Sequence, residues 1–130
     1  MSITRKREIG DFGEDATKMF LVKHGMKILG SNYLRPWGEI DIIAQDSNGI
    51  VRFIEVKTSK YFDGSSFDPE MRVNKRKILR LRKICETYLS ENKVPIDQEW
   101  QIDVVSVILN EGNNIKEIRH IENAVFGKTY

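Results

Sequence analysis

The chain has 130 residues, of which 40% are hydrophobic and 31% charged, and its formal net charge is only +2 at pH 7. This length fits one globular domain covering residues 1–130, and so small a net charge does not by itself indicate a nucleic-acid or membrane partner. The sequence has no apolar stretch long enough to span a membrane and no signal peptide, and its single cysteine, Cys85, excludes an internal disulfide. We therefore expect a cytoplasmic protein with no membrane partner.

Residues 5–24 are predicted to form the first helix. Apolar residues recur there at helical spacing, and Gly25 supplies a stop signal. Residues 26–35 then predict a first strand that ends in a turn at residues 35–38. The side chains of the helix that we expect to face the sheet are Ile9, Phe12, Ala16, Met19 and Phe20.

Two further strands, at residues 39–45 and 50–57, are predicted to form a β-hairpin. The residues between them are of the types that tolerate tight turns. A three-residue loop with Gly49 in the left-handed conformation places Asp41 opposite Glu55, and this is the register that we favour. A four-residue loop would instead pair Asp41 with Ile54 and send the two carboxylates to opposite faces.

The favoured register brings two like charges together. Side chains directly opposite each other on paired strands lie roughly 4.5 to 5.5 Å apart, where like charges are destabilising. A hard divalent cation such as Mg²⁺, bound by Asp41 and Glu55, would relieve the repulsion and keep water ligands for chemistry. Lys57, on the same strand face as Glu55, would lie beside the ion. The alternative is an exposed hairpin face with an ion pair from Lys57 to Glu55 or Glu39.

The second half of the chain predicts a long connection, a helix and one or two strands. Residues 58–72 contain aromatic residues and are interpreted as a substrate-binding loop. A helix follows at residues 74–92, with Asn74 as its N-cap and an apolar face that includes Ile78, Leu81 and Cys85. Residues 100–109 predict a buried strand, and residues 115–121 a short strand or turn in which His120 has a structural role.

The start of this second helix is strongly basic, because seven of the twelve residues from 72 to 83 are Lys or Arg. A charge run on a helix is usually a solvated face, but this one has no acidic residues interleaved at helical spacing. We therefore expect it to bind phosphate. The residues assigned to nucleic-acid binding are Arg72, Lys75, Arg76 and Arg80.

These elements predict an α/β fold in the order αβββαβ, with a mixed central sheet flanked by helices. The second helix is expected to connect two parallel neighbouring strands, residues 50–57 and 100–109, across one face of the sheet.

Residues 38–44 (GEIDIIA) and 53–57 (FIEVK) resemble the YraN family of small bacterial proteins. Supporting matches include Gly13-Glu14 and Asn32 before the hairpin, Lys75 after it, and residues 102–105 and 120–124. The resemblance implies a restriction-endonuclease-like fold, that of PD-(D/E)XK nucleases, similar to archaeal Holliday-junction resolvases. The chain departs from the family at Gln101-Ile102 and Thr58-Ser59-Lys60, so DNA contacts are not assigned there.

The activity that this resemblance implies is metal-dependent hydrolysis of DNA, with branched DNA as substrate and a homodimer by analogy with the resolvases. Mg²⁺ or Mn²⁺ would be held by Asp41, Glu55 and the carbonyl of Val56, and Lys57 would act on the nucleophile or the phosphate. Family analogy adds Glu14, although a helical wheel places it nearly opposite the apolar stripe and on the face of Leu21. Two alternatives remain: a DNA-binding module without cleavage, and an RNA-processing or partner-binding protein.

Overall fold

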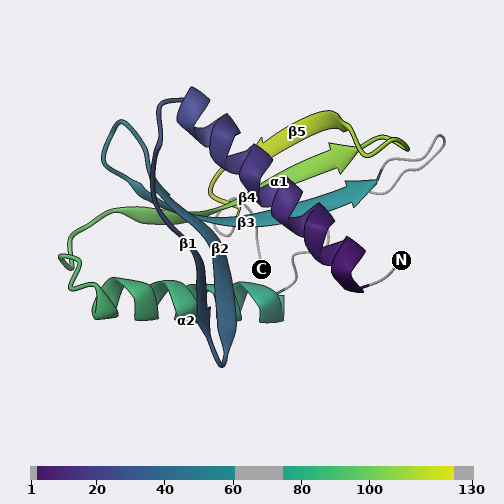
Figure 1. Cartoon of the computed structure of the whole chain (residues 1–130). Helices are drawn as coiled ribbons and strands as arrows, with labels where there is room; N and C mark the ends of the chain where they lie inside the picture. Colours follow the sequence, from purple (N-terminus) through teal and green to yellow (C-terminus); the bar gives the residue numbers. More distant parts are fainter. Residues whose placement is uncertain (1–2, 61–74, 125–130) are drawn as a thin grey trace.

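The computed structural model describes residues 3–60 and 75–124, and its elements follow the predicted order with one strand added at the end (Figure 1). The predicted αβββαβ order is confirmed, and residues 115–121 form a full strand. In chain order the elements are α1 (Ile3–Lys23), β1 (Lys27–Arg35), β2 (Gly38–Gln45), β3 (Val51–Lys60), α2 (Lys75–Glu91), β4 (Trp100–Leu109) and β5 (Ile115–Ile121).

The five strands form one mixed sheet in the order β1-β2-β3-β4-β5. Neighbouring strands are antiparallel except for β3 and β4, which are parallel and pair from Val51 with Trp100 to Lys60 with Leu109. Parallel neighbours need a crossover connection, and α2 provides it, as the sequence predicted. No helix in the described part of the chain is long and apolar enough to cross a membrane.

The β2–β3 hairpin has the predicted loop and the predicted register as far as Ile42 with Ile54, but the predicted pairing of Asp41 with Glu55 is not among the described pairs. Its pairs run from Gln45 with Val51 to Ile42 with Ile54. Gly49 has a φ of 84°, and the Asp46 N–H donates to the Ile50 carbonyl at 3.0 Å. These features define the three-residue loop and contradict the four-residue alternative.

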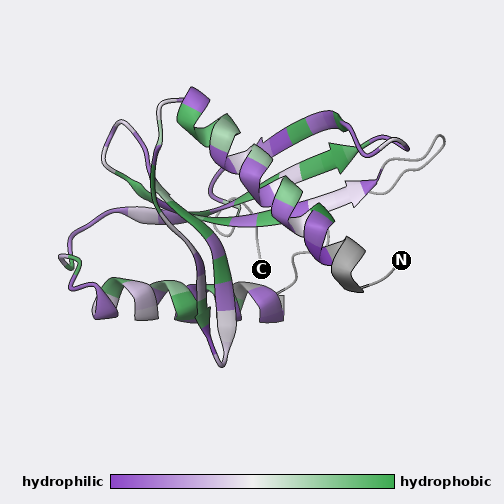
Figure 2. Ribbon diagram, viewed as in Figure 1, coloured by the Kyte–Doolittle hydropathy of each residue, from purple (hydrophilic) through white to green (hydrophobic). Residues whose placement is uncertain are grey.

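Each face of the sheet carries its own apolar core and its own helix (Figure 2). Phe53 and Ile43 pack on the α2 side with Leu81 and Cys85. The α1 side is packed mainly by aliphatic side chains: Leu21, Ile42, Ala44, Ile54, Val105, Val107 and Leu109. Side chains that alternate along β3 therefore supply both cores, and two helices are enough to cover the sheet.

The predicted inward face of α1 is partly wrong. Phe12 and Met19 are 43% and 73% exposed, whereas Gly13, Thr17 and Leu21 are buried. The cause is a close approach of backbone to sheet, because a Cβ on Gly13 would lie only 1.9 Å from Thr58 Oγ1. This contact sets the rotation of the helix more strongly than its apolar stripe does.

The predicted inward face of α2 agrees with the structure where side chains are described. Leu81 and Cys85 are buried, and Ile84 joins them. The predicted N-cap Asn74, the side chain of Ile78 and most of the predicted loop, residues 61–72, lie outside the described residues.

Candidate functional site

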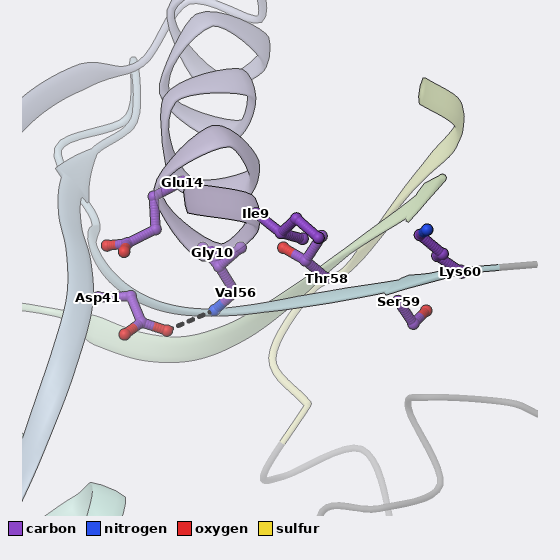
Figure 3. Close-up of a pocket in the computed structure, with 8 residues that line it drawn as sticks. All are labelled: Ile9, Gly10, Glu14, Asp41, Val56, Thr58, Ser59 and Lys60. Carbon is purple, nitrogen blue, oxygen red and sulfur yellow. Dashed lines mark hydrogen bonds between the residues drawn. The ribbon is translucent and has the colours of Figure 1, made fainter. Parts of the chain in front are cut away.

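A cleft of about 420 Å³ lies where the N-terminal half of α1 crosses β2 and β3 (Figure 3). Its polar groups come from three elements. Glu14 projects from α1 toward Asp41 on β2, and the Val56 backbone lies beside Asp41. We call this the acidic cleft; its lining residues are Ile9, Gly10, Glu14, Asp41, Val56, Thr58, Ser59 and Lys60.

The acidic cleft opens because β2 and β3 stop pairing. The last described pair is Ile42 with Ile54, and continuing the register would bring Ile40 to Val56. Instead, the Val56 N–H donates to Asp41 Oδ2 at 2.8 Å. A side-chain carboxylate thus takes the place of a ladder carbonyl, which anchors Asp41 at the mouth of the gap.

β2 is irregular at Asp41. Ile40 packs in the α2 core and Ile42 in the α1 core, although residues two apart on a strand normally face the same side. On β1, Asn32 lies between the partners of these two residues and has a φ of 53°. Asparagine tolerates this left-handed conformation better than most residues. The irregularity allows Asp41 to reach the cleft under α1.

Asp41 has a pKa raised to about 7. Burial is the main cause, and the negative charges of Glu14, Glu39 and Glu55 add to it, while the hydrogen bond from Val56 opposes it. Near neutral pH this carboxyl is therefore balanced between its neutral and charged forms. Such a group responds strongly to any cation that reaches it.

Glu14 faces the cleft, contrary to the helical-wheel expectation. Burial raises its pKa, and the charge of Glu39 raises it further. When the Asn32 amide nitrogen is oriented toward the carboxylates, it donates to Glu14 Oε1 at 2.8 Å and to Glu39 Oε1 at 3.3 Å. Leu21, predicted to share the face of Glu14, is fully buried.

Glu55 lies on the α2 side of the sheet and is not among the residues that line the acidic cleft, although its charge contributes to the raised pKa of Asp41. Its side chain is 12% exposed, and Oε1 lies 2.5 Å from the Nζ atom of Lys77. Within the described residues, Oε2 is buried and has no hydrogen-bond partner. A buried carboxylate oxygen without a donor from the protein is costly, so this atom is open to a water molecule or a cation. Lys57 is half-buried two residues along the same strand.

The predicted DNA-binding residues are only partly described. Arg76 and Arg80 are exposed and lie one turn apart on α2. Arg72 and the side chain of Lys75 lie outside the described residues. Lys77, which was not assigned to the site from the sequence, links this basic end of α2 to Glu55.

The described residues contain no group of three or more His, Cys, Asp or Glu side chains placed to hold a metal. Mg²⁺ does not require such a group, because it is usually bound by one or two carboxylates, with water and substrate phosphate as its other ligands. Asp41 and the unpaired Oε2 of Glu55 are oxygen donors of the appropriate kind. The donor set therefore fits a hard divalent cation.

Sequence reasoning missed two members of this region, Asn32 and Lys77. Asn32 had a weak signal, because it stood among the family matches and asparagine is enriched at positive φ. For Lys77 the sequence carried no signal beyond its place in the basic run, since its contact with Glu55 depends on how α2 lies on the sheet.

A second polar cluster surrounds Asp103, which is fully buried. Gln101 Nε2 and the Asn123 N–H both donate to Asp103 Oδ1 at 2.8 Å. Arg52 NH1 donates to Oδ2 at 3.0 Å, and His120 Nε2 lies 2.8 Å from the same atom. Both oxygens of Asp103 are therefore satisfied within the protein, and the cluster serves to connect β3, β4 and β5.

The fold and this site define a mixed α/β protein with an acidic cleft at the point where two strands diverge. The chain belongs to the family described as "Uncharacterised protein family UPF0102", whose model matches residues 13–107. This membership confirms the family resemblance found in the hairpin and carries no assigned activity.

Relatives in this family cover nearly the whole chain. A "UPF0102 protein" of Dictyoglomus thermophilum is 41% identical over 118 residues, which is 91% of this chain and 97% of the relative. Another from Caldicellulosiruptor bescii is 36% identical with the same coverage. Among solved structures, "The structure of Pyrococcus Furiosus SfsA in complex with Ca2+" has a TM-score of 0.34 and 15% identity, over 90% of this chain and 63% of that chain.

Proposed function

We propose that this protein is a metal-dependent DNA endonuclease, which hydrolyses phosphodiester bonds with Mg²⁺ or Mn²⁺ held by Asp41 and Glu55. The observation that carries the proposal is the pair itself. The charge of Glu55 helps to raise the pKa of Asp41 to about 7, while Glu55 keeps one buried oxygen unpaired. Two acidic groups held in this state gain most from a shared cation.

The Val56 carbonyl is the third proposed ligand. In an extended strand the N–H and C=O of one residue leave on the same side. Because the Val56 N–H donates to Asp41, its carbonyl is also directed toward β2. The backbone of β3 can therefore add a neutral oxygen to the two carboxylates.

A bound divalent ion would lower the pKa of a water ligand and polarise the phosphate. The residues around the ion would position it and set the charge of the site. Asp41 is fixed by the Val56 N–H, and Glu14 adds a negative charge at the same cleft. Lys57, on the same face of β3 as Glu55, supplies a positive charge for a phosphate oxygen.

The basic end of α2 is the proposed contact for the DNA backbone. Arg76 and Arg80 are exposed on the helix that also carries the Lys77 contact to Glu55. Arg72 and Lys75 would extend this surface. Branched DNA as the preferred substrate and a twofold dimer as the active form are proposals that come only from the family resemblance.

A cleavage assay tests the proposal. Purified protein is incubated with junction, flap, single-stranded and duplex DNA, and with single-stranded RNA, in Mg²⁺ or Mn²⁺. We expect DNA cleavage that Asp41→Asn and Lys57→Met each reduce by at least about 100-fold. Binding of DNA without cleavage under either metal would favour the non-catalytic module. Cleavage confined to RNA, or no nucleic-acid binding, would favour the RNA-processing or partner-binding alternative.

A further inference from the structure

Lys77 forms the one described ion pair that joins a helix to the proposed metal ligands. Its Nζ atom lies 2.5 Å from Glu55 Oε1, and the lysine side chain is 43% exposed whereas the glutamate is 12% exposed. The glutamate of this pair is therefore nearly buried, whereas the lysine is partly exposed to solvent. Its free energy of formation is limited by the exposure of the lysine.

This ion pair leaves the charge of the site only partly balanced. Lys77 satisfies one oxygen of Glu55, and the other stays buried without a partner. The negative charges of Glu14 and Glu39 raise the pKa of Asp41, and the charge of Glu39 also raises the pKa of Glu14. Lys18 lowers the pKa of Glu14, but burial and the neighbouring acids still raise it, so a divalent cation between Asp41 and Glu55 would add positive charge that the cluster lacks.

The ammonium group and the metal ion are rivals for the same carboxylate. Both are cations, and binding of the ion within a few Å of Lys77 would set up a repulsion between them. The lysine side chain is long and half exposed, so its ammonium group can move away while the stem remains on the protein surface. Arg76 and Arg80 are exposed near Lys77 along α2, and they are the proposed contacts for the DNA backbone.

We propose that Lys77 is an internal counterion of Glu55, which a divalent cation displaces, and that the released ammonium group then binds a substrate phosphate. The inference rests on the proposed function. It assigns Lys77 two successive partners, a carboxylate in the metal-free protein and a phosphate in the substrate complex. Lys77 therefore lowers the metal affinity of the substrate-free protein and contacts the substrate once the metal ion has bound.

The test compares Mn²⁺ affinity with cleavage rate, because a purely structural role would move both in the same direction. Mn²⁺ affinity is measured by calorimetry without DNA for the wild type, Lys77→Met and Lys83→Met. We expect Lys77→Met to bind Mn²⁺ about threefold to fivefold more tightly. Under saturating Mn²⁺ it should cleave DNA about tenfold more slowly, as expected for the loss of one phosphate contact.

Lys83→Met is the matched control for charge. It removes the same charge from the same helix, but Lys83 Nζ lies over the Trp37 ring, 5.5 Å from its centroid, rather than at Glu55. Its Mn²⁺ affinity should equal that of the wild type. Lys77→Arg, which keeps the charge, should restore wild-type Mn²⁺ affinity, and thermal unfolding of each variant shows that it is folded.

Unchanged or weaker Mn²⁺ binding by folded Lys77→Met would overturn the inference, as would an equal gain in Lys83→Met. Asp41→Asn separates this failure from failure of the proposed function. If Asp41→Asn loses Mn²⁺ binding while Lys77→Met binds as the wild type does, only the role of Lys77 is wrong. If the wild type and Asp41→Asn both fail to bind Mn²⁺, the metal site itself is wrong, and the inference falls with it.

Discussion

The Val56 N–H donates a hydrogen bond of 2.8 Å to Asp41 Oδ2 where β2 and β3 cease to pair. This bond places a half-buried carboxylate at the end of a ladder that would otherwise have continued. It explains how one hairpin can be both part of the core and part of a polar cleft. The consequences for Asp41 are measurable through stability and through metal binding.

The first prediction concerns the stability of the metal-free protein. An unfolded Asp41 carboxyl ionises near 3.8, whereas the folded one keeps its proton until about pH 7. Because the folded state binds the proton more tightly, Asp41 opposes folding increasingly as pH rises from about 4 to 7. Asp41→Asn keeps an acceptor for Val56 and removes this effect. Above pH 7 the variant should be more stable than the wild type by about 2–4 kcal/mol.

Urea unfolding in a chelator, at acid pH and at pH 8, measures this difference. The difference should be large at pH 8. It should disappear at a pH below about 4, where Asp41 is protonated in both the folded and the unfolded state of the wild type. A difference that is the same at both pH values would contradict the raised pKa of Asp41.

The second prediction concerns the pH dependence of Mn²⁺ binding. A metal ion binds the ionised carboxylate, so its binding competes with the proton held by Asp41 at a pKa of about 7. Apparent affinity should rise by up to about tenfold per pH unit below pH 7 and level off above it. Calorimetry in two buffers of different ionisation enthalpy should also detect proton release at pH 6. Affinity that is constant from pH 6 to pH 8 would argue against Asp41 as a ligand.

The hairpin and the crossover were predictable because local rules determine them. Gly49 at the left-handed position determines the loop, and the loop determines which residues pair, as far as Ile42 with Ile54. The parallel pairing of β3 and β4 follows from the helix between them. The order αβββαβ could be predicted from the strand-like and helix-like hydrophobic patterns along the chain alone.

The arrangement of the cleft was less predictable because it depends on contacts between distant segments. The rotation of α1, and with it the position of Glu14, depends on the close approach of Gly13 to Thr58, which no helical wheel contains. The contact of Lys77 with Glu55 similarly depends on how α2 lies on the sheet. Periodicity predicts that a helix has an inner face, but long-range packing selects which face it is.

The third prediction tests that close approach. Gly13→Ala places a methyl group against Thr58, so α1 or the Thr58 side chain must shift, and we expect a loss of about 1–3 kcal/mol in unfolding free energy. Gly10→Ala is the matched control one turn earlier in α1, where an added Cβ meets nothing within 4 Å. It should be neutral or stabilising by up to about 1 kcal/mol. Thermal unfolding of the two variants measures both changes in stability. Equal changes would show that Gly13 does not set the helix position.

The fourth prediction concerns the buried Asp103. Burial alone would raise its pKa, but hydrogen bonds from His120, the Asn123 N–H, Gln101 and Arg52 lower it below its usual value. A depressed folded pKa gives stability that is present above the usual value of 3.8 and is lost as pH falls through the folded pKa. Asp103→Asn leaves Arg52 with one buried partner fewer and should cost about 3–5 kcal/mol near neutral pH.

Glu122→Gln provides the comparison for Asp103→Asn. Glu122 also pairs with Arg52, but its side chain is 60% exposed. We expect it to cost no more than about 1 kcal/mol. Urea unfolding from pH 3 to pH 7 should show that the wild type loses its advantage over Asp103→Asn in acid. Parallel pH profiles for those two proteins would contradict the assigned ionisation of Asp103.

The central claim is that Asp41 and Glu55 bind one divalent cation between them, and a crystal structure of the protein with Mn²⁺ tests it most directly. The anomalous signal of Mn²⁺ locates the ion without reference to the expected site. We predict one Mn²⁺ with oxygens of both Asp41 and Glu55 at coordination distances of about 2.0–2.3 Å, and its loss in Asp41→Asn. Mn²⁺ bound elsewhere, or contacting neither carboxylate in crystals grown at saturating metal, would contradict the account.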